Sequence, residues 1–178
     1  MTLTPFLDAP LIVQIHAGFA VPALLLGPLA LFARTGWRLH RIAGYAWLTA
    51  MTGLAVSGLL IPAHDWALIG PVGPIHLVAL WTLWGLAGAL RLARRGQIAA
   101  HRREMKSIWF GAMGVAGLLT LLPGRTINRM VFGAPSEAGY LLIAVGLVLL
   151  ALLLRHDRGA NLDLRTARPL GSERKSAR

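Results

Sequence analysis

Residues 11–33 read LIVQIHAGFAVPALLLGPLALFA, and this stretch without a single Lys, Arg, Asp or Glu decides the class of fold. The hydrocarbon core of a bilayer is about 30 Å thick, so a helix of roughly 20 apolar residues is long enough to cross it. Because lipid offers the backbone no hydrogen-bond partner, the segment must satisfy its own N–H and C=O groups as a helix. The segment therefore predicts a transmembrane helix.

Further apolar segments follow, and each predicts another membrane-spanning helix: residues 42–61, 75–90, 101–122 and 140–154. Charged residues make up only 14% of the chain, against roughly 25% in soluble domains. We therefore expect an all-α, polytopic membrane protein: an antiparallel four-helix transmembrane bundle plus a fifth, peripheral transmembrane helix that is apolar on all sides. Residues 1–156 would form this single domain, and residues 157–178 a basic, poorly ordered cytoplasmic tail.

The net charge of +11 comes from Lys and Arg residues that lie mostly on one side of the predicted membrane. Of these 18 residues, 16 fall between spans one and two, between span three and the apolar part of span four that begins near Ser107, or after span five, and only Arg125 and Arg129 fall on the other side. Cytoplasmic loops carry such an excess, which predicts an N-terminus outside the cell and a C-terminus in the cytoplasm. Because the charges sit where orientation signals belong, a nucleic-acid partner is not expected.

Histidines are the side chains best suited to bind a metal or to act in catalysis, since the chain has no cysteine. Ionisable groups within a membrane are costly, so each is a functional hypothesis. His16 and His76 are expected toward the outer ends of spans one and three, and His40 and His101 toward the inner ends of spans two and four. In an up-down bundle each pair lies on diagonal helices, facing across the core. The pattern predicts two bis-histidine haem b sites, one near each membrane face.

Arginines and a methionine near these histidines fit the same hypothesis. Arg41 and Arg102 flank the inner pair, and Arg129 lies on the outer side, so their guanidinium groups are candidate partners for haem propionates. Met105 lies four residues after His101, on the same helix face, and is an alternative iron ligand.

The residues leave three functional hypotheses open. The first is a haem-binding electron-transfer protein, hence a membrane oxidoreductase, with a quinone or another membrane subunit as its partner. The second is a non-redox accessory or assembly subunit whose histidines and arginines form a structural network. The third is a metal-handling transporter that uses the outer histidines His16, His64 and His76. The segment HRREM at 101–105 lacks the HExxH spacing of zinc proteases.

Several motifs together resemble an uncharacterised bacterial family of polytopic membrane proteins of unknown function. They are His16 with Gly18, Leu39-His40-Arg41 with Gly44, His101-Arg102-Arg103-Glu104-Met105, and Arg129. The resemblance covers about residues 12–132 and does not include His76. It implies a membrane location, which we expect to be the bacterial inner membrane, and importance for six residues: His16, His40, Arg41, His101, Met105 and Arg129. The architecture is also similar to that of membrane dihaem cytochromes b, which is an analogy of fold alone.

Overall fold

The computed structural model describes residues 3–32, 38–63 and 67–166, and its regular elements are helices, apart from one isolated β-bridge between Ile69 and Val72. In chain order the helices are α1 (Thr4–Leu7), α2 (Leu11–Phe32), α3 (Arg38–Leu59), α4 (Pro74–Arg94), α5 (Ile98–Ile108), the π-helix η1 (Trp109–Val115), α6 (Ala116–Leu119), α7 (Thr126–Phe132) and α8 (Ala138–Thr166). The expectation of an all-α chain is confirmed.

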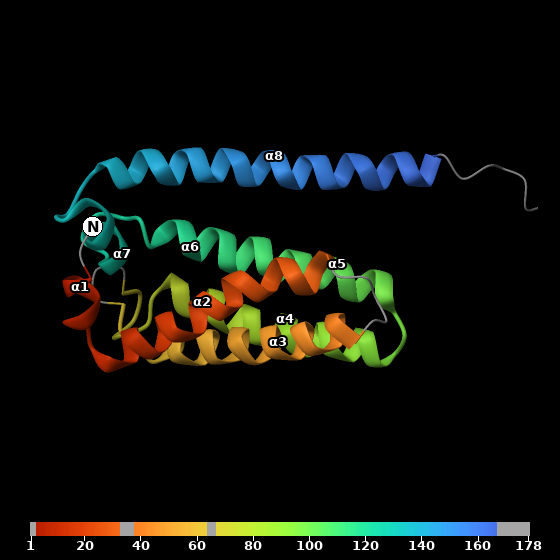
Figure 1. Cartoon of the computed structure of the whole chain (residues 1–178), viewed down its shortest axis with the longest axis horizontal. Coiled ribbons are helices and arrows are strands. Elements are labelled where there is room, and N and C mark those ends of the chain that lie inside the picture. Colours follow the sequence, from red (N-terminus) through yellow and green to blue (C-terminus); the bar gives the residue numbers. More distant parts are fainter. Residues whose placement is uncertain (1–2, 33–37, 64–66, 167–178) are drawn as a thin grey trace, which may run out of the picture.

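Helices α2, α3, α4 and the continuous run from α5 through η1 to α6 form an antiparallel four-helix bundle (Figure 1). Around this bundle α2 packs on α3, α3 on α4, α4 on α5, and α5 on α2. Helices α2 and α4 are therefore diagonal to each other, and so are α3 and α5, which is the arrangement expected from the sequence.

The two ends of the bundle differ in charge. The C-terminus of α2, the N-terminus of α3 and the α4–α5 turn lie at one end (Figure 1), which we call the basic end. Its cations are Arg38, Arg41, Arg91, Arg94, Arg95, Arg102, Arg103 and Lys106. The opposite end holds α1, α7 and the start of α8.

A glycine closes the helix hairpin at the basic end. Gly96 has φ of +71°, in the left-handed region that residues with a side chain rarely adopt. This turn brings the N–H of Gln97 to the C=O of Leu92 at 3.0 Å, which satisfies a carbonyl that the end of α4 would leave unpaired. The chain can therefore reverse and begin α5 at once.

Within the described residues, α2, α3 and α4 are the three helices long and apolar enough to cross a bilayer. Large apolar side chains such as Leu25, Ile42 and Trp84 are exposed on their outer faces, which suits contact with lipid. The remaining predicted spans correspond to the run α5–η1–α6, in which a π-helix interrupts the α-helix, and to the shorter apolar stretch Ala138–Leu152. The count of five spans stays a prediction.

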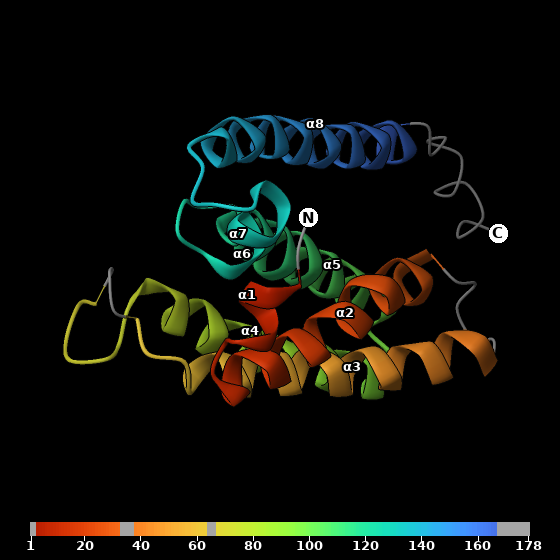
Figure 2. The same cartoon turned by 60° about the vertical axis from the view of Figure 1, so that its left-hand side comes forward.

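Helix α8 lies at the periphery, beside α6 and η1 and away from α2, α3 and α4 (Figure 2). Gly146 of α8 faces the side chain of Leu118, and Gly114 of η1 faces Leu150. The described part of α8 thus packs on one wall of the bundle, as expected for the fifth helix.

The helix α8 also runs further than the sequence analysis expects. Residues 157–166, which that analysis assigns to the tail, belong to α8, whose described part extends to Thr166. The poor order expected of the tail stays a prediction. No proline occurs between the start of α8 and Pro169, so every residue of this stretch can donate its backbone N–H within a helix. The rest of the predicted tail, residues 167–178, lies outside the described residues.

Alanines and glycines form the contact surfaces between the bundle helices. Ala23 and Ala89 are 0% exposed. Glycines receive large side chains from neighbouring helices: Gly27 faces Trp109, Gly53 faces Phe19 and Gly85 faces Ile108. A Cβ at any of these glycines would collide with its partner or press against it. Small residues of this kind let membrane helices approach closely.

Helix α7 is held at the opposite end by Asn128, which is 0% exposed. Its Nδ2 donates to the C=O of Leu121 at 2.8 Å and of Ser136 at 3.0 Å, and its Oδ1 accepts from the N–H of Ser136 at 2.9 Å. One amide side chain therefore ties together the segments that precede and follow α7.

We expect Gly27→Ala to lower the free energy of unfolding by about 1–3 kcal/mol, because the added methyl group would overpack the contact with Trp109. The matched control is Gly88→Ala, where a Cβ meets nothing within 4 Å. That change should leave stability unchanged or raise it, since alanine favours the helix by about 1 kcal/mol. Thermal unfolding in detergent measures both, and equal shifts in Tm would contradict the packing.

We expect Asn128→Ala to lower the free energy of unfolding by about 1–3 kcal/mol, because it leaves buried backbone groups without partners. Limited proteolysis should then cut faster between residues 121 and 139. The control is Arg129→Ala on the same helix, since that side chain is exposed. Equal proteolysis rates for the two variants would show that Asn128 does not fasten α7.

Candidate functional site

The basic end carries two histidines on diagonal helices. His40 lies in the first turn of α3 and His101 in the first turn of α5. The side chains of both are partly buried. The structure thus places the predicted inner pair on the helices, and at the end of the bundle, where the sequence analysis expects them.

Both imidazoles make the same kind of hydrogen bond. The Nδ1 of His40 lies 3.0 Å from the C=O of Ala30 on α2, and the Nδ1 of His101 lies 2.9 Å from the C=O of Ala89 on α4. A carbonyl oxygen can only accept, so Nδ1 must carry the proton in both rings. In the neutral form of each ring the lone pair then resides on Nε2.

The two helix hairpins are alike at this end. In each, the histidine near the start of the second helix bonds back to an alanine carbonyl on the first. In each, an exposed arginine follows the histidine directly, Arg41 in one and Arg102 in the other. The similarity of the hairpins becomes visible only in the structure.

Residues close to the inner pair leave room beside it. A Cβ at Gly44, one turn after His40, would meet nothing within 4 Å. Met105, one turn after His101, is partly buried and packs against the core cluster of the bundle. The proposed role of Met105 as an alternative ligand stays a prediction.

The opposite half of the bundle contains His16 on α2. Its Nδ1 lies 3.1 Å from the hydroxyl oxygen of Ser57 on α3, a residue that is 4% exposed. The single hydroxyl proton of Ser57 is donated within α3, where the hydroxyl oxygen lies 2.7 Å from the C=O of Gly53 and 3.1 Å from that of Leu54. The Ser57 oxygen is therefore left to accept from His16 Nδ1–H, and His16 Nε2 has no proton when the ring is neutral.

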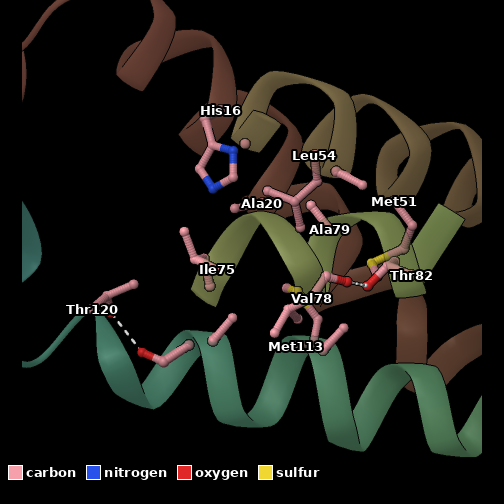
Figure 3. A pocket seen from close by; sticks show the side chains of 15 residues that line it. His16, Ala20, Met51, Leu54, Ile75, Val78, Ala79, Thr82, Met113 and Thr120 are labelled. Carbon is pink, nitrogen blue, oxygen red and sulfur yellow. Dashed lines mark hydrogen bonds between the residues drawn. The ribbon is translucent and has the colours of Figure 1, made fainter. Parts of the chain in front are cut away.

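A cavity of about 140 Å³ lies beside His16. It is lined by residues of α2, α3, α4, η1 and α6, which are mostly alanine, glycine and larger apolar side chains. Figure 3 shows the imidazole of His16 pointing into this space, with Met51 and Thr82 at its far side and Met113 below.

His76 makes a different kind of hydrogen bond from His16, His40 and His101. It is 5% exposed at the start of α4, and its Nδ1 accepts a hydrogen bond from the N–H of Gly73 at 3.0 Å. In the neutral ring the proton is therefore on Nε2. Among the described residues His76 does not line the cavity next to His16, so the predicted outer pair does not share that space.

The other predicted residues are dispersed. Arg129 is exposed on α7 at the opposite end. His64 lies outside the described residues, and only the backbone is described at His156. Among the described residues no group of three His, Cys, Asp or Glu gathers to hold a metal ion. The metal-handling hypothesis, which also needs His64, stays a prediction.

Sequence reasoning missed Ser57, which fixes the imidazole of His16 from 41 residues away. A lone serine inside an apolar span was the available signal, since a hydroxyl in a membrane helix needs a partner. The buried Nε1–H of Trp109 has no hydrogen-bond partner among the described residues.

The fold defines the chain as an all-α integral membrane protein, and its bundle carries hydrogen-bonded histidine side chains toward each end. The family model described as "Predicted membrane protein (DUF2306)" matches residues 13–155, and the chain belongs to this family of unknown function. The expected family of uncharacterised membrane proteins is confirmed, whereas the importance of its motifs stays a prediction. Searches of curated proteins and of solved structures each found no match.

We expect four of the helical histidines, those whose hydrogen bonds are described, to divide into two tautomers at about pH 9, where an ordinary imidazole is neutral. His16, His40 and His101 should carry the proton on Nδ1, and His76 on Nε2, because their hydrogen-bond partners differ. Long-range ¹H–¹⁵N correlation spectra of histidine-labelled protein report the tautomer directly. Single His→Gln variants assign the signals, and a common tautomer for all four would contradict the described hydrogen bonds.

Proposed function

We propose that the chain binds one b-type haem between His40 and His101 and transfers electrons within the membrane. The observation that carries the proposal is the matched donation of Nδ1–H to an alanine carbonyl, at 3.0 Å for His40 and 2.9 Å for His101. Metal-ligating histidines commonly donate their second nitrogen in this way, which fixes the ring and leaves the other nitrogen for the metal. Bound haem would supply reversible one-electron chemistry.

The surrounding residues support this assignment. Because α3 and α5 are diagonal, the two histidines belong to helices on opposite sides of the bundle. The open space at Gly44 gives a planar group room beside His40. Arg41 and Arg102 stand next to the ligands, where their guanidinium groups would pair with propionates.

We include one haem in the proposal rather than the two expected from the sequence. Gly73 N–H donates to Nδ1 of His76, which places the proton of the neutral ring on Nε2. That nitrogen then has no free lone pair for iron. His16 and His76 therefore make a weaker ligand pair than His40 and His101.

Orientation belongs to the same proposal. We place the basic end at the cytoplasmic face of a bacterial inner membrane and the N-terminus outside, because 16 of the 18 Lys and Arg residues are on that side or in the segment after residue 154. The electron partner would be a quinone or another membrane subunit, since both are accessible from the lipid.

A second candidate function is a non-redox accessory subunit, and the same hydrogen bonds favour it. His40 links α3 to α2, and His101 links α5 to α4, so each imidazole also fastens one helix hairpin. For such a subunit the histidines matter for stability, and the purified protein is colourless.

The two functions are separated by the reduced-minus-oxidised visible spectrum of protein purified in detergent from cells that supply haem. We expect a b-type signal in the wild type, its loss in both His40→Ala and His101→Ala, and its retention in His16→Ala and His76→Ala. The reason is that only the first two variants lose an iron ligand.

Folding is controlled by size-exclusion chromatography of each variant. In addition, free imidazole should restore the signal to His40→Gly and His101→Gly, because it can replace the missing ligand while the hairpin hydrogen bond stays absent. A colourless wild type, or a signal that survives both inner substitutions, would remove the haem proposal and leave the accessory subunit.

A further inference from the structure

The cavity beside His16 lies outside the proposed haem site and has its own chemistry. Its volume of about 140 Å³ is close to that of cavities of about 150 Å³ that hold one benzene molecule. Its walls are almost wholly apolar, and the protein places a single imidazole in them. The space suits one six-membered ring.

Methionines on two helices add a preference for an aromatic ring. Met51 of α3 and Met113 of η1 both line the cavity, and Figure 3 shows them on the side away from His16. Thioether sulfur makes favourable contacts with aromatic rings, and the flexible methionine side chain adapts to a bound ring.

Every polar side chain that lines the cavity already uses its N–H or O–H group as the donor of a hydrogen bond within the protein. His16 Nδ1–H is used by Ser57 at 3.1 Å. The hydroxyl of Thr82 donates to the C=O of Val78 at 2.7 Å, and that of Thr120 to the C=O of Gly117 at 2.6 Å. With a neutral imidazole, these side chains can offer a ligand only acceptors. A ligand that complements them must therefore bring its own O–H or N–H donor.

The cavity reaches the apolar surface of the bundle. Its lining residues Ile75 and Thr120 are exposed at the ends of α4 and α6 near the opposite end, and the neighbouring Leu77 and Leu119 are also exposed. A ligand arriving here comes from the lipid side or from the membrane surface, which favours a lipid-soluble molecule.

We infer that this cavity binds the ring of a phenol or hydroquinone, whose O–H donates to Nε2 of His16. The site does not depend on the haem proposal, because none of its side chains belongs to the inner histidine pair. The same ring chemistry occurs in small water-borne phenols and in hydroquinones that carry a prenyl chain and reside in the membrane.

The test measures binding of 4-fluorophenol and of fluorobenzene to the full-length protein in detergent by ¹⁹F NMR, with protein-free micelles as the blank. We expect saturable binding of both, with 4-fluorophenol about tenfold tighter because of its hydrogen bond. In His16→Phe, which keeps a ring at this position, the two probes should bind equally. Equal affinities in the wild type, or an unchanged ratio in His16→Phe, would overturn the inference.

Two matched Ala→Leu substitutions on α4 test where the ring binds. Ala79→Leu would fill the cavity and should abolish binding of both probes. Ala87→Leu is the same change on the same helix at an exposed position away from the cavity and should leave binding intact. Binding that survives Ala79→Leu would place the probes elsewhere and overturn the inference.

The source of the ring is tested by adding a hydroquinone with one prenyl unit to protein in lipid nanodiscs. Tighter binding than 4-fluorophenol identifies a membrane-borne hydroquinone, equal or weaker binding identifies a water-borne phenol, and no binding of either refutes the site. These results are independent of the visible spectrum. If the protein is colourless and binds 4-fluorophenol, the ring-binding inference stands and the haem proposal fails. If it is coloured and does not bind 4-fluorophenol, the haem proposal stands and the ring-binding inference fails.

Discussion

Close approach of helices through alanine and glycine is the constraint on which the rest of this structure depends. Where Ala23, Ala30 and Ala89 face a neighbouring helix, their methyl groups are too small to cover their own backbone carbonyls. Trp47, His40 and His101 can therefore each donate to one of these carbonyls from the neighbouring helix. In lipid, where water cannot satisfy a donor, such a bond both anchors the ring and holds the helices together.

Other small residues account for the space at both candidate sites. At the basic end, Gly44 leaves open space beside an imidazole whose orientation is fixed. Nearer the opposite end, Ala20, Ala55, Ala79 and Gly117 are too short to meet across the bundle, and a cavity remains beside His16. Packing is dense between these places, where Trp47 and Ile108 are almost fully buried. A packed apolar core therefore separates the two candidate sites.

Much of the fold follows from the sequence because lipid imposes a simple rule: long apolar segments must be helices. The predicted span of residues 11–33 corresponds to α2, Leu11–Phe32, and the predicted diagonal arrangement follows from antiparallel hairpins. The hydrogen-bond partners of the histidines do not follow in the same way. Whether Ser57 or a carbonyl faces a ring depends on helix rotation, and the reversed role of His76 depends on the turn at Gly73. The size of the cavity depends on how far the short alanine and glycine side chains around it lie from one another, and the pattern of apolar residues does not determine that distance.

The π-helix η1 begins between His101 at the basic end and the residues Ala116 and Gly117 of α6 that line the cavity. A π-turn contains an extra residue relative to the α-helix, so it changes the angular phase of everything that follows it. Each residue of an α-helix advances by about 100°, and loss of that one residue would turn α6 by a similar angle relative to α5. His101 and Met105 would keep their directions, while Ala116 and Thr120 would rotate away from the cavity. The continuous run α5–η1–α6 can therefore direct the residues before η1 and the residues after it toward different sides. The length of η1 sets the angle between these two directions.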